Sequence, residues 1–287
     1  MTSIAVWDLL KCTCAFIHRL FGPISLASPS FGYSWIGYTR PNIEYAHIFA
    51  GYVSFALTAF VSIERCLCVC RPFTVKSVFT ARFTTLMVLM ISAVVFGSYS
   101  VMFFIYDVEL VFNPDLNAIV AVYVYNMFYY AHRATVLVYY QVAGITLPTL
   151  SITVLCVCSI TTVYHLKRSQ DFLRSRHNFD SGISRKEKQV VKMLLTVVFV
   201  NIGNLLPRIV FYTAQLFEPE FYLLRKYNNI FFMTRCFITV LDFIKSSVNF
   251  FIYYRMSSNF HATFSELFAP CRSKFKAFFP PCLDKHQ

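Results

Sequence analysis

Long apolar runs separated by short polar stretches follow one another along most of the chain. Three of these runs contain no Lys, Arg, Asp or Glu: Tyr45–Ile63, Phe83–Tyr106 and Ala134–Tyr164. Each is long enough to cross about 30 Å of hydrocarbon as a helix. Two further runs, Val191–Phe217 and Asn228–Tyr254, are apolar overall but contain charged side chains. The pattern predicts an all-α fold, a polytopic bundle of transmembrane helices.

The opening segment, residues 1–21, is the weakest candidate span because Asp8, Lys11 and Arg19 interrupt it. It has no basic flank followed by an apolar core and a small-residue cleavage site, so we do not interpret it as a signal peptide. Charged side chains within apolar spans are costly and are more often functional than those in loops. The charged residues within the last two runs include Arg208, Arg235, Asp242 and Lys245.

The composition supports a membrane protein, with 57% hydrophobic and only 14% charged residues. Soluble domains carry about 25% charged residues. The net charge is +12, and Lys and Arg collect in residues 71–82 and 167–188, whereas residues 107–133 carry acidic side chains. Short loops rich in Lys and Arg stay in the cytoplasm, so the first two stretches face inward and the third faces outward. The basic residues border lipid spans instead of forming one groove, which argues against nucleic acid as a partner.

A charged pair ends the first apolar run. The residues Glu64-Arg65-Cys66, followed by Arg71-Pro72-Phe73, resemble the motif that closes the third helix of rhodopsin-family (class A) G protein-coupled receptors. Near the chain end, "VNFFIYY" resembles the Asn-Pro-x-x-Tyr motif of the seventh helix, with Asn249 and Tyr253 kept and Phe250 replacing the proline. The order of these motifs along the chain also agrees with the family.

Other positions agree with the same resemblance. The stretch "SIAVWDLL" is similar to the second-helix motif, with Asp8 as its acid, and Pro148 and Pro207 fall inside the expected fifth and sixth helices. Phenylalanines recur every four residues between 260 and 268. Such a stripe is typical of a short amphipathic helix on the membrane surface.

The resemblance covers roughly residues 1–268, which it identifies as a rhodopsin-like domain of helices 2 to 7 plus the short surface helix; residues 269–287 would form a cytoplasmic tail. The first helix is absent from this alignment, which implies an incomplete gene model or a truncated product with both termini in the cytoplasm. The phrase "CLCVCRPFTVKS" and the basic third loop look most like molluscan chemosensory receptors, which are themselves similar to invertebrate peptide receptors.

The resemblance implies a multi-pass receptor of the plasma membrane that passes an extracellular chemical signal to heterotrimeric G proteins. A chemosensory role is the first expectation, and a neuropeptide receptor of the FMRFamide type is the alternative. The ligand would be a small molecule or a peptide, bound within the lipid bilayer.

The activation switch implied by the resemblance centres on Arg65. In the resting state Glu64 would hold Arg65, together with Glu187, which lies twenty residues before the sixth-helix proline. Releasing these contacts would free Arg65 to meet a G protein, with Asn249 and Tyr253 as further switch residues. In the alternative interpretation, the two glutamates only balance the charge of the basic loops.

A polar core is implied deeper in the bundle, where the family often holds a sodium ion. The residues at those places are Asp8, Ser54, Ser246 and Asn249, and Lys245 stands where the family has a neutral polar residue. A carboxylate buried in lipid needs compensation, which an ammonium group could supply instead of sodium. The alternative is a local i, i+3 pair between Asp242 and Lys245 on one helix.

The ligand pocket is predicted from the same counting. Amine receptors place an Asp eighteen residues before the motif Arg, but here that position is His47, which argues against an amine ligand. Arg208 could meet a carboxylate of an anionic ligand or of a peptide terminus. Its alternative is to extend to the membrane interface. The full set predicted to line the pocket is His47, Tyr140, Gly144, Arg208, Tyr212 and Thr239.

The ten cysteines lie in expected helices, at their cytoplasmic ends or in the tail. A disulfide framework is therefore not expected. Cys66, Cys68 and Cys70 alternate at a helix end and make a poor metal site, so no metal is predicted. Cys271 and Cys282 follow the surface helix among basic residues and are candidates for palmitoylation, with no modification as the alternative.

The sequence carries no signature of an enzyme: it has no Gly-rich phosphate loop and no His-Glu-x-x-His motif, and no cofactor is predicted. A transporter or channel is the alternative from another class, with Arg208, Asp242 and Lys245 along a solute or proton path. A truncated product that does not signal is a third alternative.

Overall fold

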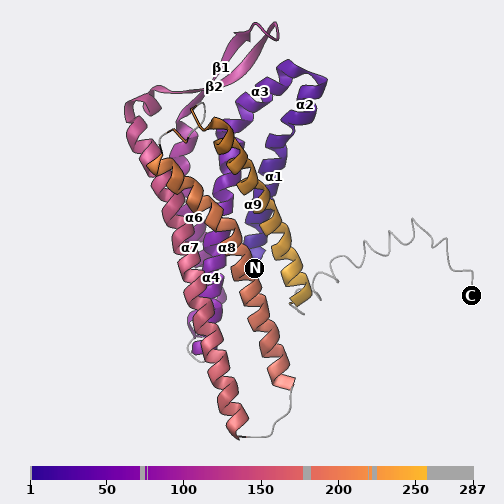
Figure 1. Ribbon diagram of the computed structural model, residues 1–287, viewed down its shortest axis with the longest axis vertical. Helices are drawn as coiled ribbons and strands as arrows, with labels where there is room; N and C mark the ends of the chain where they lie inside the picture. The colour runs from indigo at the N-terminus through magenta and orange to yellow at the C-terminus, as the bar shows by residue number, and fades with distance from the viewer. Residues whose placement is uncertain are drawn as a thin grey trace, which may run out of the picture.

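The computed structural model describes residues 2–71, 75, 77–176, 182–218, 220–221 and 225–256. Six long helices run along the molecule (Figure 1). They are α1 (Thr2–Arg19), α4 (Tyr45–Cys70), α6 (Ala81–Ser98), α7 (Met127–Arg176), α8 (Gly182–Phe217) and α9 (Asn228–Met256). The all-α transmembrane bundle predicted from the apolar runs is confirmed.

Shorter elements gather at one end of the bundle (Figure 1). These are α2 (Phe21–Ala27), α3 (Pro29–Thr39), the π-helical turn η1 (Arg40–Glu44), the 3-10 turn η2 (Ser100–Phe104) and the strands β1 (Tyr106–Asn113) and β2 (Ala118–Tyr125). The turn η1 joins α3 to α4 without a break in helical structure, so the chain returns from this end into the bundle.

Helix α4 lies at the centre of the bundle and packs against α1, α6 and α7. Its middle is buried on nearly every side: Phe49, Tyr52 and Phe55 are each no more than 2% exposed. The buried ring of Tyr99 stacks on Phe49 at 4.7 Å and on Tyr52 at 4.9 Å between centroids. A helix that is apolar all round is typical of a position surrounded by other helices, and this core sets the places of the neighbouring helices.

Within the described residues, four helical stretches are long and apolar enough to cross a membrane: Pro29–Cys70, Ala81–Ser98, Met127–His165 and Leu195–Phe217. Helices α1 and α9 contain charged residues within their length. The side chains of Asp8, Lys11, Asp242 and Lys245 are buried inside the bundle. These charges therefore form an internal polar face that contacts protein and not lipid.

The expected outer loop after α6 is in fact a β-hairpin. Strands β1 and β2 pair antiparallel, with Tyr106 opposite Tyr125 and Asn113 opposite Ala118. Asn117 occupies the left-handed region at φ 46° in the connecting turn. Asn tolerates this backbone conformation better than most residues because its side chain bonds locally.

The hairpin docks on α3. Ser34 Oγ accepts a hydrogen bond from the backbone N–H of Ala121 at 3.1 Å. A Cβ atom on Gly37 would lie 2.1 Å from the carbonyl oxygen of Ala121, so this contact needs glycine. The guanidinium of Arg40 lies 4.9 Å from the ring centroid of Tyr123. Helix α3 and strand β2 thus lie close enough for their backbones to be in contact.

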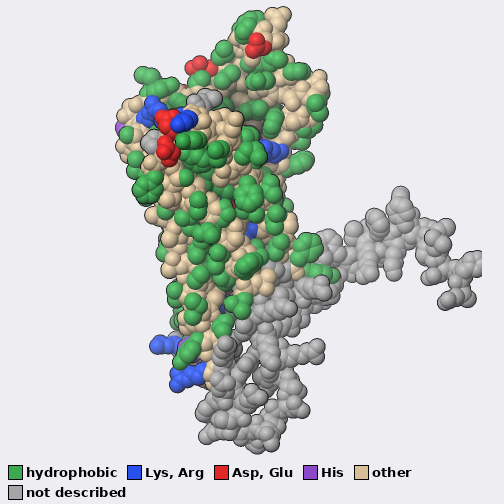
Figure 2. Space-filling view, viewed as in Figure 1, with side chains coloured by type: hydrophobic (Ala, Val, Ile, Leu, Met, Phe, Trp, Pro, Cys, Tyr) green, Lys and Arg blue, Asp and Glu red, His purple; other side chains and the backbone are tan. Residues whose placement is uncertain are grey.

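The two ends of the bundle differ in charge. The C-terminal ends of α4 and α7 lie at the end opposite the hairpin (Figure 1), where Lys and Arg side chains are exposed (Figure 2). Acidic side chains lie at the hairpin end in the same view, together with further Lys and Arg side chains. We therefore use "outer end" for the hairpin end and "inner end" for the opposite one, following the charge rule applied to the sequence. The expected surface helix at 260–268 lies outside the described residues.

Candidate functional site

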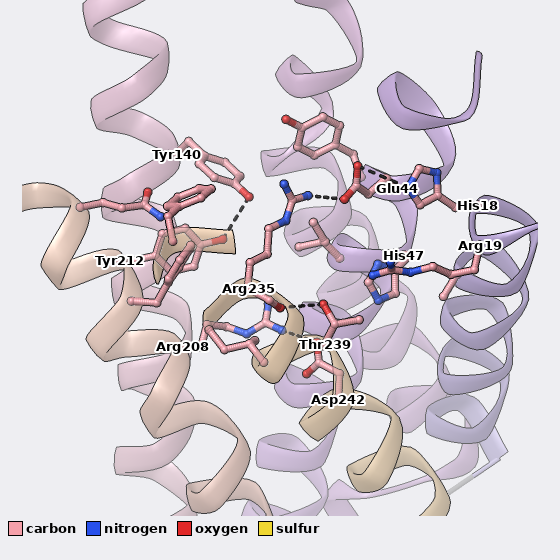
Figure 3. Close-up of a pocket in the computed structure, with 17 residues that line it drawn as sticks. His18, Arg19, Glu44, His47, Tyr140, Arg208, Tyr212, Arg235, Thr239 and Asp242 are labelled. Carbon is pink, nitrogen blue, oxygen red and sulfur yellow. Dashed lines mark hydrogen bonds and ion pairs between the residues drawn. The ribbon is translucent and has the colours of Figure 1, made fainter. Parts of the chain in front are cut away.

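A cavity of about 110 Å³ lies toward the outer end of the bundle, with walls from α1, α4, α7, α8 and α9 (Figure 3). One buried water needs about 10–15 Å³ measured in this way, so the space suits several waters or one small organic molecule. Of the residues predicted to line a ligand pocket, five do so: His47, Tyr140, Arg208, Tyr212 and Thr239. Gly144 does not line it, but lies directly behind Tyr212.

Glu44 forms the upper charge cluster of the cavity with Arg235 and His18 (Figure 3) and with Arg40. Arg235 of α9 pairs with Glu44 Oε1, and Arg40 Nε lies 3.3 Å from Oε2. His18 Nε2 of α1 lies 3.8 Å from the same oxygen, and its Nδ1 is hydrogen-bonded to Thr39 Oγ1 at 2.9 Å. This one carboxylate therefore links α1, η1 and α9.

The lower charge cluster is the ion pair between Arg208 Nη2 of α8 and Asp242 Oδ2 of α9 (Figure 3). Both side chains are 5% exposed. Arg208 therefore points into the bundle and does not extend to the membrane interface. Each partner keeps a buried polar atom without a hydrogen-bond partner within the described part of the chain: Arg208 Nε and Asp242 Oδ1.

His47 of α4 also lines the cavity, two residues before the core aromatic Phe49. Its ring stacks on Phe243 with 6.1 Å between centroids, and the residue is buried. Its Nε2 has no hydrogen-bond partner among the described residues. His47 thus presents a third unpartnered polar atom beside the Arg208–Asp242 pair in the cavity lining.

Tyrosine hydroxyls connect three helices along one side of the cavity. Tyr52 Oη donates to Tyr212 Oη at 3.2 Å, which in turn donates to Tyr140 Oη at 3.0 Å. The guanidinium of Arg208 lies 5.0 Å from the centroid of the Tyr52 ring. A Cβ atom added at Gly144 would lie 2.8 Å from the Tyr212 ring, so glycine makes room for this ring. The chain of hydroxyls fixes how α4, α7 and α8 meet.

A tyrosine pair joins the cavity wall to the hairpin. Tyr45 Oη and Tyr106 Oη lie 2.9 Å apart, and their rings stack with 5.8 Å between centroids. Burial raises the pKa of Tyr106, so its hydroxyl remains protonated at physiological pH. It can then serve as a hydrogen-bond donor at the base of the hairpin.

The polar core lies on the inner side of the cavity. Lys245 Nζ donates to Ser54 Oγ at 2.7 Å and lies 3.6 Å from Asp8 Oδ1, while Ser54 Oγ donates to the same Asp8 oxygen at 2.8 Å. Asp242, the partner in the alternative i, i+3 pair, is instead paired with Arg208. Ser246 Oγ donates to the carbonyl oxygen of Asp242 at 3.1 Å. The Asn249 side chain lies outside the described part of the structure.

Lys11 is a member of this core that the sequence interpretation missed. It is 1% exposed, lies 3.7 Å from Asp8 Oδ1 and donates from Nζ to the carbonyl oxygen of Asp242 at 3.0 Å. The i, i+3 spacing from Asp8 was an available signal, since such positions are neighbours on a helix. Two ammonium groups thus share one carboxylate.

The residues of the predicted activation switch are less connected. Glu64 is half-buried and Arg65 is exposed at the inner end of α4, and no ion pair joins these two described side chains. Glu187 lies in α8 and Tyr253 in α9, but their side chains fall outside what the structure describes. The role of these residues in coupling stays a prediction. Cys271 and Cys282 also lie outside the described residues.

Comparison with known proteins identifies the family. The family described as "7 transmembrane receptor (rhodopsin family)" matches residues 1–253. Comparison with curated protein sequences gives no match. The matched range contains the cavity, the polar core and all six long helices except the last turn of α9. The chain therefore belongs to the rhodopsin family of seven-transmembrane receptors, which are signalling receptors of membranes and not enzymes.

Proposed function

We propose that this protein is a plasma-membrane receptor that binds an extracellular ligand in the cavity and passes the signal to a heterotrimeric G protein. One observation carries the proposal: the cavity walls are joined by ion pairs between different elements, one of them buried and one half-buried. Arg208–Asp242 joins α8 to α9, and Arg235–Glu44 joins α9 to the start of α4. A ligand that binds there alters the contacts between helices directly.

The mechanism follows from these interhelical pairs. A ligand shifts a two-state equilibrium only through different contacts in the two states. A group that competes for Arg208 or Asp242 changes the packing of α8 against α9 and can bias a movement of α8. We propose that this movement is read at the inner end by Arg65, which is exposed there. Glu64, Glu187, Asn249 and Tyr253 remain its proposed partners in the switch.

For the ligand, we propose a chemosensory role and a small molecule. The cavity of about 110 Å³ is compact, and its base is closed by the Arg208–Asp242 pair. An FMRFamide-type peptide is the alternative, in which only the terminal residue would enter the cavity. A transport path is less favoured because Arg208, Asp242 and Lys245 each contact a buried group of opposite charge, which opposes ion movement along the bundle.

The polar core carries a separate proposal about ion dependence. Lys245 and Lys11 occupy the surroundings of the Asp8 carboxylate, at 3.6 and 3.7 Å from Oδ1. A buried carboxylate with two ammonium neighbours has little remaining affinity for a cation. We propose that these lysines make the receptor independent of sodium.

The test of the receptor function is nucleotide exchange on purified heterotrimeric G proteins by the full chain in lipid nanodiscs. The expected result is exchange above that of empty nanodiscs, lost on Arg65→Ala while surface expression in cells stays normal. Arg168→Ala, an exposed basic residue of the inner end, is the matched control and should retain exchange. Equal exchange by Arg65→Ala and the unmodified protein would reject the switch, and no exchange with any G protein class would favour a non-signalling product.

A further inference from the structure

The Arg208–Asp242 pair has one unused polar atom on each partner. Arg208 Nε is a donor without an acceptor, and Asp242 Oδ1 is an acceptor without a donor, within the described residues. Buried polar groups are nearly always hydrogen-bonded, and leaving one unpaired is costly. Both atoms are buried, so a ligand reaches them only by opening the pair toward the cavity; one that supplies an acceptor and a donor close together would then satisfy both atoms at once.

The charge of the cavity favours an acceptor that is an anion. Three arginines line the cavity, Arg19, Arg208 and Arg235, against two carboxylates, Glu44 and Asp242. A ligand carboxylate therefore enters a site with an excess of positive charge. Charge-assisted bonds from guanidinium to carboxylate are about twice as strong as neutral ones, so Arg208 Nε is the natural partner of this carboxylate.

The donor of the ligand must lie beside its carboxylate. Asp242 Oδ1 belongs to the carboxylate that already pairs with Arg208, so the two unused atoms are parts of one ion pair. An N–H group on the carbon next to the ligand carboxylate has the spacing to reach the second partner of such a pair. Positive and negative groups would then alternate in the order Arg208, ligand carboxylate, ligand nitrogen and Asp242. Each buried charge would have a neighbour of opposite polarity, which offsets the cost of burying it.

The rest of the cavity offers aromatic and aliphatic surface. Phe211 and Phe231 lie with 5.2 Å between ring centroids, and Ile48, Ile238 and Tyr212 complete this part of the lining. Aromatic side chains in such surroundings gain from both burial and ring contacts. The apolar part of the ligand is therefore expected to be an aromatic ring or a group of similar size.

We propose that the cavity binds a carboxylate with an N–H donor on the adjacent carbon and an aromatic side chain, the chemistry of an aromatic α-amino acid or of a peptide C-terminus. The carboxylate binds Arg208 Nε, the N–H group binds Asp242 Oδ1, and the ring packs toward Phe211 and Phe231. This inference rests on the proposed function in one respect, that the cavity is the ligand site. It does not require coupling to a G protein.

The test uses four probes that differ in one group each, with the thermal unfolding temperature of the full chain in nanodiscs as the readout. L-Phenylalanine has both groups, N-acetyl-L-phenylalanine replaces the ammonium by an amide N–H, L-phenylalaninamide lacks the carboxylate and 3-phenylpropionate lacks the nitrogen. At concentrations up to about 10 mM, ligand binding raises the unfolding temperature by mass action. Phenylalanine or its N-acetyl derivative should stabilise the receptor, and the other two probes should not.

The first two probes distinguish a free amino acid from a peptide C-terminus as the source of the ligand chemistry. A larger effect of phenylalanine supports a free amino acid, and a larger effect of the N-acetyl derivative supports a peptide terminus; either result supports the proposed chemistry. Equal stabilisation by phenylalaninamide or by 3-phenylpropionate would overturn it, as would no stabilisation by either carboxylate that carries an N–H group.

A variant test locates the site. The double change Arg208→Gln and Asp242→Asn removes both charges together, so no unpaired charge is left buried. It should weaken binding of the stabilising probe by about tenfold or more. The matched control is Arg225→Gln with Glu220→Gln, an exposed pair 3.6 Å apart outside the cavity lining. Unchanged affinity in the cavity variant would place the probe elsewhere.

The inference and the proposed function can fail separately. Binding of the probe without G protein activation would overturn the proposed function but leave this inference standing. G protein activation without binding of the probes would overturn the inference alone.

Discussion

Replacing Glu44 by Gln keeps the size of the side chain but removes the carboxylate shared by Arg235, Arg40 and His18. The glutamate side chain is 17% exposed, and those of Arg235 and Arg40 are 29% and 25% exposed. Breaking a fully buried pair costs about 3–5 kcal/mol, whereas exposed pairs contribute about 0–1 kcal/mol. For these half-buried partners we expect a loss of about 2–3 kcal/mol in the free energy of unfolding.

The loss can be measured as a shift in the thermal unfolding temperature of the purified receptor. At about 2–4 °C per kcal/mol for a chain of this size class, Glu44→Gln should lower the unfolding temperature by about 4–12 °C. The control is Glu220→Gln, whose partner Arg225 lies 3.6 Å away with both side chains over 40% exposed. That variant should shift the temperature by less than about 4 °C.

A double variant separates the ion pair from other effects of the substitution. When Arg235→Gln is added to Glu44→Gln, the second change should cost less than it does in the unmodified protein, because its partner is already gone. The reasoning would be refuted if Glu44→Gln and Glu220→Gln shifted the unfolding temperature equally, or if the Glu44 and Arg235 substitutions were simply additive.

Further predictions concern the tyrosine chain and the polar core. Gly144→Ala places a methyl group against the Tyr212 ring and should destabilise the receptor by about 1–3 kcal/mol through overpacking, measured by thermal unfolding; a neutral effect would mean that Tyr212 moves freely. The unmodified receptor should unfold at the same temperature in sodium chloride and in choline chloride. Lys245→Asn removes one ammonium group from Asp8 and should make that temperature rise with sodium. Equal values for the variant in both salts would contradict a role of Lys245 in replacing the ion.

The sequence predicts the helices well because lipid imposes a strong local pattern. An apolar run such as Phe83–Tyr106 needs only its own composition to be identified as a span, although its helix ends at Ser98 in the structure. Five of the residues chosen by counting from Arg65 and from the helix prolines lie on the cavity wall, and their role in binding a ligand stays a prediction. Once the family alignment sets the position of one residue in a helix, the helical repeat indicates which other residues share its face.

The charged interior is harder to predict, because its partners are distant in sequence. Glu44 and Arg235 are 191 positions apart, as are Ser54 and Lys245. Composition marks Arg235 as a charge at membrane depth, but it does not indicate which acid compensates for it. Lys11 was interpreted as an interruption of a weak span, whereas three-dimensional packing turns it inward. The hairpin was missed because its residues were assigned only by their position between two spans and by their acidic charge.

The attachment of the hairpin to α3 is entirely noncovalent, since the chain contains no cysteine between Cys70 and Cys156. The attachment includes a hydrogen bond from the Ala121 N–H to Ser34 and the close backbone approach at Gly37, and Arg40 of η1 adds a contact to the Tyr123 ring. The hairpin can therefore dock on α3 without an oxidative folding step, and thiol reductants have no bond to break between them. The close fit requires glycine at position 37.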